Sequence, residues 1–327
     1  MDLSIVVPVY NEEENIPLLH QAITRAVVPL EFAWEVILVD DGSQDGSPAA
    51  LRRLAEADPE HVRVVQLRRN FGQTAAIAAG IDFSCGEVVV LMDADLQNDP
   101  EDIPLMLAQI NAGYDVVSGW RKSRQDDLSR RLPSRLANGL ISAVTGVHLH
   151  DYGCTLKAYR REVITGFKLY GEMHRFIPVY ADSVGARIIE MQVRHHARRF
   201  GKAKYGLERT AKVMLDLVTV KFLSSYANKP IYLFGGAGFV LIASAALLLL
   251  YLFVRRVFAG VSVLGSPLFQ VSTMVSILGF QSILMGLIAE LLVRTYHESQ
   301  GKPTYTVKQV INLDKDEPER YERQRVE

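Results

Sequence analysis

Val88-Val-Val-Leu-Met-Asp-Ala-Asp-Leu-Gln97 is a short apolar run that ends in two aspartates one residue apart. An aliphatic stretch followed by polar residues predicts a buried strand with Asp93 and Asp95 at its carboxyl end. Two carboxylates this close are costly to bury unless a cation lies beside them. Carboxylate oxygens select a hard ion, which is commonly shared with phosphate oxygens. The segment therefore predicts a strand that leads into a Mg²⁺ or Mn²⁺ site.

Further short, β-branched runs alternate with helical stretches over the first 200 residues. Strands are expected at Leu3–Val9, Glu35–Val39 and Val62–Leu67, and helices at Glu12–Ala26, Gly72–Ser84 and Glu101–Ala112. Strands that alternate with helices form right-handed βαβ units around a mainly parallel sheet. The expected fold class is therefore α/β, with a Rossmann-like sheet.

Polar side chains follow each of the four expected strands. They are Tyr10, Asn11 and Glu12 after the first, Asp40, Asp41 and Ser43 after the second, Arg69 to Gln73 after the third, and Asp93, Asp95 and Gln97 after the fourth. In parallel sheets, ligands bind beyond the carboxyl ends of the strands. We therefore expect the four clusters to converge on one crevice.

Two long apolar runs lie in the last third of the chain. Residues 231–254 carry no charge, and residues 268–293 are interrupted only by Gln270, Gln281 and Glu290. Each run is long enough to cross about 30 Å of hydrocarbon as a helix. Together they predict a transmembrane hairpin, and the distribution of Lys and Arg around it places both chain ends in the cytosol.

These segments divide the chain into four parts. They are a cytosolic α/β domain at 1–204, a juxtamembrane segment at 205–229, the hairpin at 230–294 and a cytosolic tail at 295–327. Apolar and basic residues recur at helical spacing between Tyr205 and Tyr226, which predicts an amphipathic helix in the membrane interface. A helix packed on the α/β domain is the alternative. Mixed charge from Asp314 onward predicts a disordered end.

The charges of the chain are unevenly distributed. The 327 residues carry a net charge of -1, but residues 1–118 hold 20 acidic and 6 basic side chains, whereas residues 194–229 hold 2 acidic and 9 basic. This asymmetry indicates a membrane surface or an anionic substrate, and we expect no nucleic-acid partner. The sequence contains no Gly-x-Gly-x-x-Gly or Walker motif, so the usual dinucleotide and P-loop sites are excluded.

Small residues recur four apart in the second apolar run, at Ser272/Ser276 and Ser282/Gly286. Such pairs let helices pack closely in a membrane. They would serve contacts within one hairpin or between chains, so a homo-oligomer formed through the hairpin is one of two alternatives.

Seven motifs resemble those of glycosyltransferase family 2, whose members have the GT-A fold. They are Ser4-Ile-Val-Val-Pro-Val-Tyr-Asn-Glu12, Asp40-Asp-Gly-Ser43, Arg69-Asn-Phe-Gly-Gln73, Asp93-Ala-Asp-Leu-Gln97, Asp151-Tyr-Gly-Cys154, Met173-His-Arg-Phe176 and Arg198-Arg-Phe-Gly-Lys-Ala-Lys-Tyr205. With two membrane helices behind them, they resemble the polyprenyl-phosphate glycosyltransferases over about residues 3–310. Asp151-Tyr-Gly-Cys154 is similar to the corresponding motif of the aminoarabinose enzymes, and Met173-His-Arg-Phe176 is similar to that of the hexose enzymes. The sequence therefore does not decide which sugar is transferred.

The resemblance implies an inverting, metal-dependent transfer of a sugar from a UDP- or GDP-sugar to a polyprenyl phosphate at the cytoplasmic membrane. The donor would be bound by Pro8, Tyr10, Glu12, Asp40, Asp41, Gln73, Asp93, Ala94 and Gln97, and the Mg²⁺ or Mn²⁺ ion by Asp93, Asp95 and Gln97. The acceptor phosphate would be bound by Arg121, Arg131, Arg135, Arg198 and Lys204, and the reaction would depend on Asp95, Arg121, Asp151 and Arg198. A phosphate that is substantially dianionic at neutral pH needs no strong base. An orienting role is therefore favoured for Asp151 over that of a proton acceptor.

Two other functions are compatible with the sequence. A membrane-tethered glycosyltransferase would use a water-soluble acceptor, and a non-catalytic sensor would bind the nucleotide sugar without transferring it. A processive polysaccharide synthase is disfavoured, because it should carry a Gln-x-x-Arg-Trp motif and the only tryptophans are Trp34 and Trp120.

Overall fold

The computed structural model describes residues 1–122, 138–139, 141–165, 169, 173–197, 231–260, 262–299 and 304–313. They belong to two compact units, which we call the sheet unit (Met1–Val220 with Pro303–Glu327) and the hairpin unit (Lys221–Lys302). The expected amphipathic helix at 205–229 and the chain end from Asp314 lie outside the described residues.

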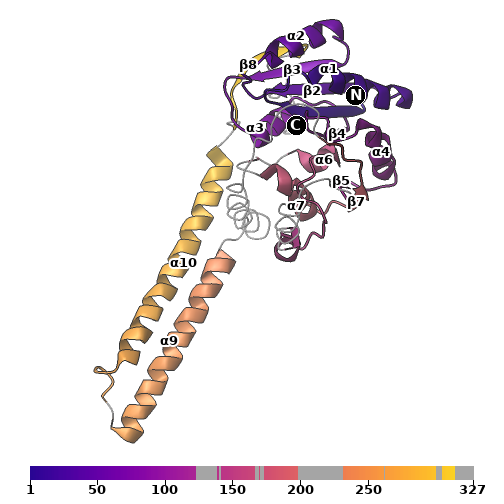
Figure 1. The fold of residues 1–327 in the computed structure, drawn as a ribbon. Coiled ribbons are helices and arrows are strands. Elements are labelled where there is room, and N and C mark those ends of the chain that lie inside the picture. The colour runs from indigo at the N-terminus through magenta and orange to yellow at the C-terminus, as the bar shows by residue number, and fades with distance from the viewer. Residues whose placement is uncertain are drawn as a thin grey trace. The chain divides into compact units, whose positions relative to one another are not determined.

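The sheet unit is built on one eight-stranded sheet (Figure 1). Its strands are β1 (Leu3–Val9), β2 (Trp34–Asp40), β3 (Val62–Leu67), β4 (Val88–Leu91), β5 (Val116–Trp120), β6 (Lys157–Arg160), β7 (Ile188–Gln192) and β8 (Val307–Ile311). Their order is β7-β5-β6-β4-β1-β2-β3-β8. Strands β6 and β8 run antiparallel to their neighbours, and the remaining pairings are parallel. The mainly parallel, Rossmann-like α/β sheet is thereby confirmed.

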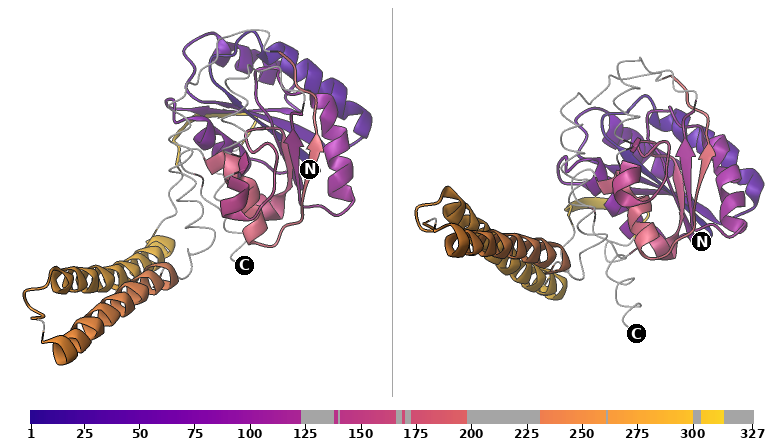
Figure 2. Two further views of the ribbon diagram at one scale, coloured as in Figure 1. Left: turned by 60° about the horizontal axis from the view of Figure 1, so that its bottom comes forward. Right: turned by 90° about the horizontal axis from the view of Figure 1, so that it is seen from below.

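Helices connect the strands and cover both faces of the sheet (Figures 1 and 2). They are α1 (Ile16–Val27), α2 (Ser47–Ala57), α3 (Gln73–Asp82), α4 (Ile103–Asn111), α6 (Arg161–Ile164) and α7 (Ile177–Ser183), with 3-10 turns η1 (Val28–Leu30), η2 (Pro100–Asp102) and η3 (Met173–Phe176). Helix α1 contacts α2 and α4, whereas α3 contacts η3.

The strands are apolar at successive positions because both faces of the sheet are buried. Ile5 and Val7 of β1 belong to the core cluster that includes residues of α1, α2 and α4. Val6 points the other way, where it lies so close to Gly80 of α3 that a side chain on Gly80 would collide with it. Continuous apolar runs, rather than alternating ones, are therefore the pattern to expect in these strands.

The four strands and three helices expected from the sequence are all present, and β1 and β3 have the expected bounds. Helix α2 and the strands β5 to β8 were not predicted. These four strands are only four or five residues long, and each is placed by pairing with a strand far away in the sequence.

Strand β8 is the unexpected element after the hairpin, in a part of the chain that the sequence suggested only as a tail. It pairs with the edge strand β3, and its flanks are held by Tyr305 Oη, which donates to Asp82 Oδ2 at 2.8 Å, and by Asn312 Nδ2, which donates to the carbonyl oxygens of Ala55 and Val62 at 2.9 Å. The chain therefore returns to the sheet unit after leaving it for the hairpin.

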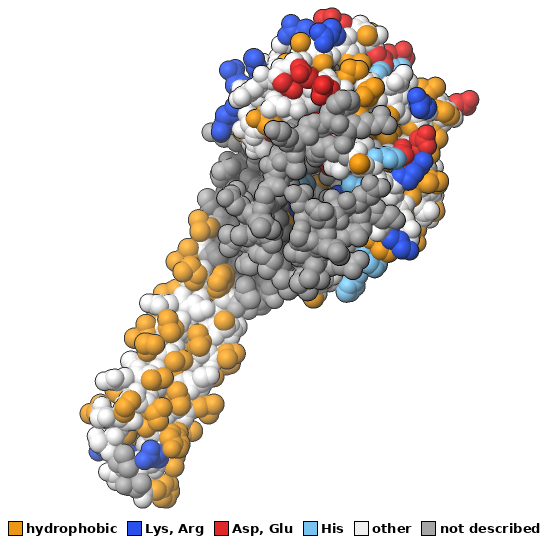
Figure 3. All heavy atoms as spheres, viewed as in Figure 1, with side chains coloured by type: hydrophobic (Ala, Val, Ile, Leu, Met, Phe, Trp, Pro, Cys, Tyr) orange, Lys and Arg blue, Asp and Glu red, His pale blue; other side chains and the backbone are white. Residues whose placement is uncertain are grey.

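The hairpin unit consists of two long helices, α9 (Ile231–Ala259) and α10 (Pro267–Ser299). Within them, Phe234–Phe258 has a mean hydropathy of 2.6 and Pro267–Ile288 one of 1.8, so both are long and apolar enough to cross a membrane. Figure 3 shows hydrophobic side chains spread over the visible face of both helices. The apolar runs expected at 231–254 and 268–293 lie inside these two helices.

Small residues let the two helices approach closely. A Cβ atom built on Gly238 would lie 2.5 Å from the carbonyl oxygen of Gly279, and Ser282 Oγ donates to the carbonyl oxygen of Phe234 at 2.8 Å. The buried positions recur every seven residues, at Gly238, Ala245 and Leu252 in α9 and at Ser272, Gly279 and Gly286 in α10. A seven-residue repeat of buried positions is the pattern of a close-packed helix pair.

We expect Gly279→Leu to destabilise the hairpin, because its side chain would meet the backbone of Gly238 and the side chain of Ile242. Overpacking of this kind costs about 1–3 kcal/mol. The measurement is an SDS titration of the protein in detergent, followed by far-UV circular dichroism. Gly236→Leu is the control, since no atom lies within 4 Å of a Cβ at Gly236. Equal SDS midpoints of unfolding for the two variants would contradict the close contact between Gly279 and Gly238.

Candidate active site

The carboxyl ends of β1 to β4 meet at one edge of the sheet because the four strands are parallel. Strand β6 runs antiparallel to both β4 and β5, so β5 points the same way as β4. Strand β7 runs parallel to β5 and therefore also points this way. Antiparallel β6 begins at this edge, where Lys157 pairs with Leu91 of β4 and Ser118 of β5. The loops after β1 to β5 and the loop before β6 therefore surround one region.

Hydrogen bonds join the ends of β1 and β2. The backbone N–H of Asn11 donates to Ser43 Oγ at 3.0 Å, and the N–H of Gln44 donates to Asn11 Oδ1 at 2.8 Å. The N–H of Glu12 donates to Ser47 Oγ at 2.8 Å. Asn11 has a φ of 52°, in the left-handed region that Asn tolerates. Pro8 within β1 and Tyr10 just after it thus lead directly into this network.

Asp40 and Asp41 brace the loops that follow β2 and β3. Asp40 is fully buried and accepts from the N–H of Ser43 at 2.9 Å and from Gln66 Nε2 at 3.0 Å. Asp41 accepts from the N–H groups of Phe71 and Gly72 at 2.7 and 2.9 Å. Burial raises the pKa of Asp41, and these two N–H groups oppose that rise. Both carboxylates therefore hold these two loops in place.

Gly42 allows the turn after β2 to lie against the loop after β3. Its φ is +69°, and a Cβ atom there would lie within 2.8 Å of the backbone of Arg69 and Asn70. Both the left-handed conformation and the close approach of two backbones favour glycine. The Asp40-Asp-Gly-Ser43 motif thus contacts the Arg69-Asn-Phe-Gly-Gln73 motif through close backbone packing as well as through hydrogen bonds.

The loop after β4 holds Asp93 and Asp95 in place. Gln73 Nε2 donates to Asp93 Oδ1 at 2.8 Å, and the N–H of Gln97 donates to Asp95 Oδ1 at 3.1 Å. Leu96, between Asp95 and Gln97, has a φ of 60°, a conformation that is strained for a residue with a branched side chain and that clusters at functional sites. The structure therefore brings together Gln73, Asp93, Ala94, Asp95 and Gln97, as the sequence led us to expect.

The oxygen atoms around Asp95 suit a hard divalent ion whose remaining coordination positions are filled by a bound ligand. Within the described part of the chain, no group of three or more His, Cys, Asp or Glu side chains could hold a metal ion by itself. Mg²⁺ is typically bound through one or two carboxylates, with waters and substrate phosphates supplying the other oxygens. Asp93 and Asp95 on the loop after β4 could supply the two carboxylates of such a site.

Arg121, directly after β5, forms a bidentate ion pair with Asp151. Arg121 Nε and Nη2 donate to Asp151 Oδ2 and Oδ1 at 2.7 and 3.0 Å, and both side chains are largely buried. Burial lowers the pKa of Arg121, but the bond and charge of Asp151 outweigh it, so this pKa lies above its usual value. Asp93 acts on Arg121 in the same direction. The ion pair therefore lies within electrostatic range of Asp93.

Sequence reasoning missed two residues that hold the loop containing Asp151. Glu190 of β7 accepts from the backbone N–H groups of His150 and Asp151. Lys157 is buried, and its ammonium group donates to the carbonyl oxygens of Tyr152 and Cys154. Burial lowers the pKa of Lys157. Neither residue has a signal in the local sequence, because each reaches the loop only through the pairing of β5, β6 and β7.

The segment after β7 runs beside the loop after β4. Arg194 Nε donates to Asp102 Oδ1 at 2.9 Å, and the N–H of His196 donates to the carbonyl oxygen of Gln97 at 2.9 Å. The chain thus passes Gln97 at His196. Arg131, Arg135, Arg198 and Lys204, expected to bind the acceptor phosphate, lie outside the described residues.

Comparison with known proteins gives relatives that match nearly the whole chain. A dodecaprenyl-phosphate galacturonate synthase from Rhizobium johnstonii is 44% identical over 95% of this chain and 94% of its own length. Two undecaprenyl-phosphate 4-deoxy-4-formamido-L-arabinose transferases, from Proteus mirabilis and Pseudomonas fluorescens, are 37% and 40% identical over 96% and 94% of this chain, and 95% and 89% of their own.

Solved structures support the fold assignment. A glucosyl-3-phosphoglycerate synthase from Mycobacterium tuberculosis, solved with Mn²⁺, uridine diphosphate and phosphoglyceric acid, matches 68% of this chain and 78% of its own with a TM-score of 0.53. At 20% identity, this likeness concerns the fold alone. Residues 4–167 match Glycosyl transferase family 2. With that match and with relatives of 37–44% identity along almost its entire length, the chain belongs to glycosyltransferase family 2, among the polyprenyl-phosphate glycosyltransferases.

Proposed function

We propose that this protein transfers a sugar from a nucleotide-sugar donor to the phosphate of a polyprenyl lipid, for use in the cell envelope. The observation that carries the proposal is the extent of the similarity. Relatives that act on dodecaprenyl or undecaprenyl phosphate match 94–96% of the chain, which includes the hairpin as well as the sheet unit. A likeness restricted to the sheet would support sugar transfer without indicating a lipid acceptor.

The donor would occupy the edge of the sheet where β1 to β4 end. The loops after β1, β2 and β3 are suited to the nucleoside, and Asp40 and Asp41 brace the second and third of these loops. Asp93 and Asp95 follow β4, which pairs with β1. A Mg²⁺ or Mn²⁺ ion held by these two aspartates would neutralise charge that develops on the leaving diphosphate. Gln73 restrains Asp93 through its 2.8 Å hydrogen bond, which keeps the carboxylate oriented.

An oxygen of the acceptor phosphate would act as the nucleophile. This oxygen would form a bond to the sugar C1 while the bond from C1 to the nucleoside diphosphate breaks, and the diphosphate leaves. One displacement of this kind inverts the anomeric centre. Because the second pKa of a phosphate monoester is near 6, no strong base is needed at neutral pH. Asp151 is engaged by both Nε and Nη2 of Arg121, which favours an orienting role.

The hairpin would hold the protein at the membrane that contains the lipid. The chain belongs to the sheet unit both before and after the hairpin, since β8 pairs with β3. Both ends of the hairpin must then reach the same side of the membrane. Six basic residues flank the outer ends of the two apolar runs, namely Lys212, Lys221, Lys229, Arg294, Lys302 and Lys308. Only Arg255 and Arg256 lie near the loop between the runs, so the larger number of basic residues favours the cytosol for the sheet unit.

The function is tested with a panel of radiolabelled donors and undecaprenyl phosphate in detergent. The panel contains UDP-linked galacturonate, 4-deoxy-4-formamido-L-arabinose and glucose, and GDP-linked mannose. We expect label from at least one donor to enter the organic phase only when the lipid phosphate is present. Label in a water-soluble product without lipid would indicate a soluble acceptor. Donor binding with no transfer would indicate a sensor.

Removal of a carboxylate charge at Asp95 tests the metal ion. Asp95→Asn should reduce turnover by about tenfold or more, because it removes a ligand charge with little change in volume. Chelation of wild-type protein with EDTA should abolish turnover, and titration with Mg²⁺ and with Mn²⁺ should show which ion restores it. Asp2→Asn, at the amino end of β1, is the matched control. Full turnover in a metal-free preparation would refute the metal site.

The topology is tested by reporter fusions. A fluorescent protein that folds only in the cytosol should fluoresce when it is fused after Glu327. Alkaline phosphatase should be active only when it is inserted in the loop between Arg256 and Ser266. The expectation follows from the distribution of Lys and Arg around α9 and α10. A cytosolic loop would rule out two spans.

A further inference from the structure

Two segments that lie far apart in the sequence pair beside the candidate site. Asn98, in the loop after β4, forms an antiparallel bridge with His195, which follows β7. The N–H of His196 donates to the carbonyl oxygen of Gln97 at 2.9 Å. Residues 194–196, which we call the strap, therefore lie along the loop after β4.

Arg194 fastens the strap to three carboxylates that follow this loop. Its backbone N–H and its Nε atom donate to the two carboxylate oxygens of Asp102, at 2.7 and 2.9 Å. Its Nη1 atom donates to Glu101 Oε2 at 2.8 Å, and its Nε atom lies 3.4 Å from Asp99 Oδ2. The guanidinium group thus joins the strap to η2 and to the residue just before it.

The loop that the strap holds also carries the two aspartates expected to bind the metal ion. Asn98 Oδ1 accepts from the N–H of Asp93 at 3.2 Å, and the N–H of Gln97 donates to Asp95 Oδ1 at 3.1 Å. Leu96 has a φ of 60°, a strained conformation that persists only where the surrounding structure enforces it. Gln97 and Asn98 therefore bond both to the aspartates and to the strap.

Negative charge is crowded in this part of the chain. Residues 93–102 contain five carboxylates, and like charges that lie close together repel one another. Arg194 offsets this repulsion through its ion pairs with the last three. The side chain of Arg194 is 46% exposed, but that of Asp102 is only 4% exposed. Water cannot replace the arginine at a buried carboxylate, so this pair stabilises more than an exposed ion pair would.

We propose that Arg194 is a positioning residue, which ties the strap to the loop after β4 and thereby keeps Asp93 and Asp95 in the arrangement that binds the metal ion. The inference rests on the proposed function and adds to it a residue that acts through the loop. Release of the loop would weaken the binding of a divalent ion and of the nucleoside diphosphate. Binding of the lipid acceptor would change less.

Hydrogen exchange of the wild-type protein in detergent tests the coupling without any variant. Mn²⁺ is added together with UDP, or with GDP if the wild type binds only that nucleotide. Peptides from the loop after β4 and from the strap should then be protected together, because segments that open as one unit share one exchange rate. Protection of the loop with unchanged exchange in the strap would overturn the proposal.

Two variants test the role of the guanidinium group. Arg194→Ala removes its bonds, whereas Arg194→Lys keeps a charge but lacks the fork that reaches Asp102 and Glu101 together. In Arg194→Ala, we expect the loop after β4 to exchange about tenfold faster or more. The Mn²⁺ concentration for half-maximal binding with nucleotide, read from the electron paramagnetic resonance of free Mn²⁺, should rise about tenfold. Arg194→Lys should show smaller changes in both.

A general loss of stability would give a different result. It would lower the fraction of folded protein and leave the Mn²⁺ affinity of the folded molecules unchanged, and that outcome in Arg194→Ala would overturn the proposal. The KM for undecaprenyl phosphate, measured with saturating Mn²⁺ and donor, should change less than about twofold. Arg187→Ala is the matched control, since it removes an exposed arginine at the opposite end of β7. It should behave like the wild type.

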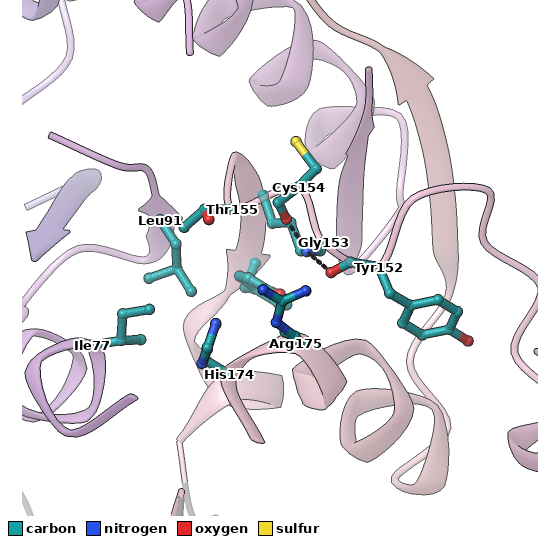
Figure 4. A pocket seen from close by; sticks show the side chains of 10 residues that line it. Ile77, Leu91, Tyr152, Gly153, Cys154, Thr155, His174 and Arg175 are labelled. Carbon is teal, nitrogen blue, oxygen red and sulfur yellow. Dashed lines mark hydrogen bonds between the residues drawn. The ribbon is translucent and has the colours of Figure 1, made fainter. Parts of the chain in front are cut away.

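The loop between β5 and β6 provides an internal reference, because different residues hold it. Lys157 donates to the carbonyl oxygens of Tyr152 and Cys154, and Figure 4 shows Tyr152, Gly153 and Cys154 along this loop. Exchange in this loop should be the same in Arg194→Ala as in the wild type. Equal acceleration of both loops would contradict a role for Arg194 that is specific to the loop after β4.

The two proposals fail separately. If the wild type transfers no sugar to polyprenyl phosphate, the proposed function fails whatever the exchange rates are. If it transfers sugar while Arg194→Ala keeps the exchange and the Mn²⁺ affinity of the wild type, only the positioning role of Arg194 fails. If Arg194→Ala does not fold, Arg194→Lys and the exchange of the wild type decide between the outcomes.

Discussion

Strand β1 pairs in parallel with β2 on one side and β4 on the other, and the candidate site depends on this register. Val9 lies opposite Asp40, and Val6 lies opposite Leu91, so the loops that carry Glu12, Asp41 and Asp93 begin at the same edge. A slip of one residue would turn every side chain of a strand to the other face. Burial of both faces opposes such a slip, because Ile5 and Val6 each contact a different layer of the core.

Polar residues at this edge serve two different tasks. Asp40, Asp41 and Glu190 use their oxygens to hold loops, and in the structure they bond to backbone N–H groups. Asp93 and Asp95 accept hydrogen bonds from Gln73 and Gln97, and two carboxylates on one loop suit a divalent ion that is shared with a ligand. Buried charge is costly unless it is paired or hydrogen-bonded. In a site rich in carboxylates, those that bind no ion must therefore be satisfied by hydrogen bonds.

The hairpin of two apolar helices is an insertion between two segments of one folded unit. Because β8 completes the sheet beside β3, the hairpin is tied to the sheet unit through both of its ends. β8 also covers an edge strand, whose unpaired backbone groups would otherwise be open to pairing with another chain. Within the hairpin, glycine and serine at the contact let the two helices approach closely.

The sequence by itself determined four strands and three helices up to residue 112, the two apolar helices, and the aspartates and glutamines at the strand ends. These features are local: a strand, a helix or a turn leaves its pattern in adjacent residues. Only the tertiary structure decided the positions of β5 to β8 and the roles of Glu190 and Lys157. Glu190 reaches Asp151 from 39 residues away, and Lys157 reaches the same loop from the start of β6. The physical reason is that their partners are set by the pairing of β5, β6 and β7, which is not recorded in the neighbouring sequence.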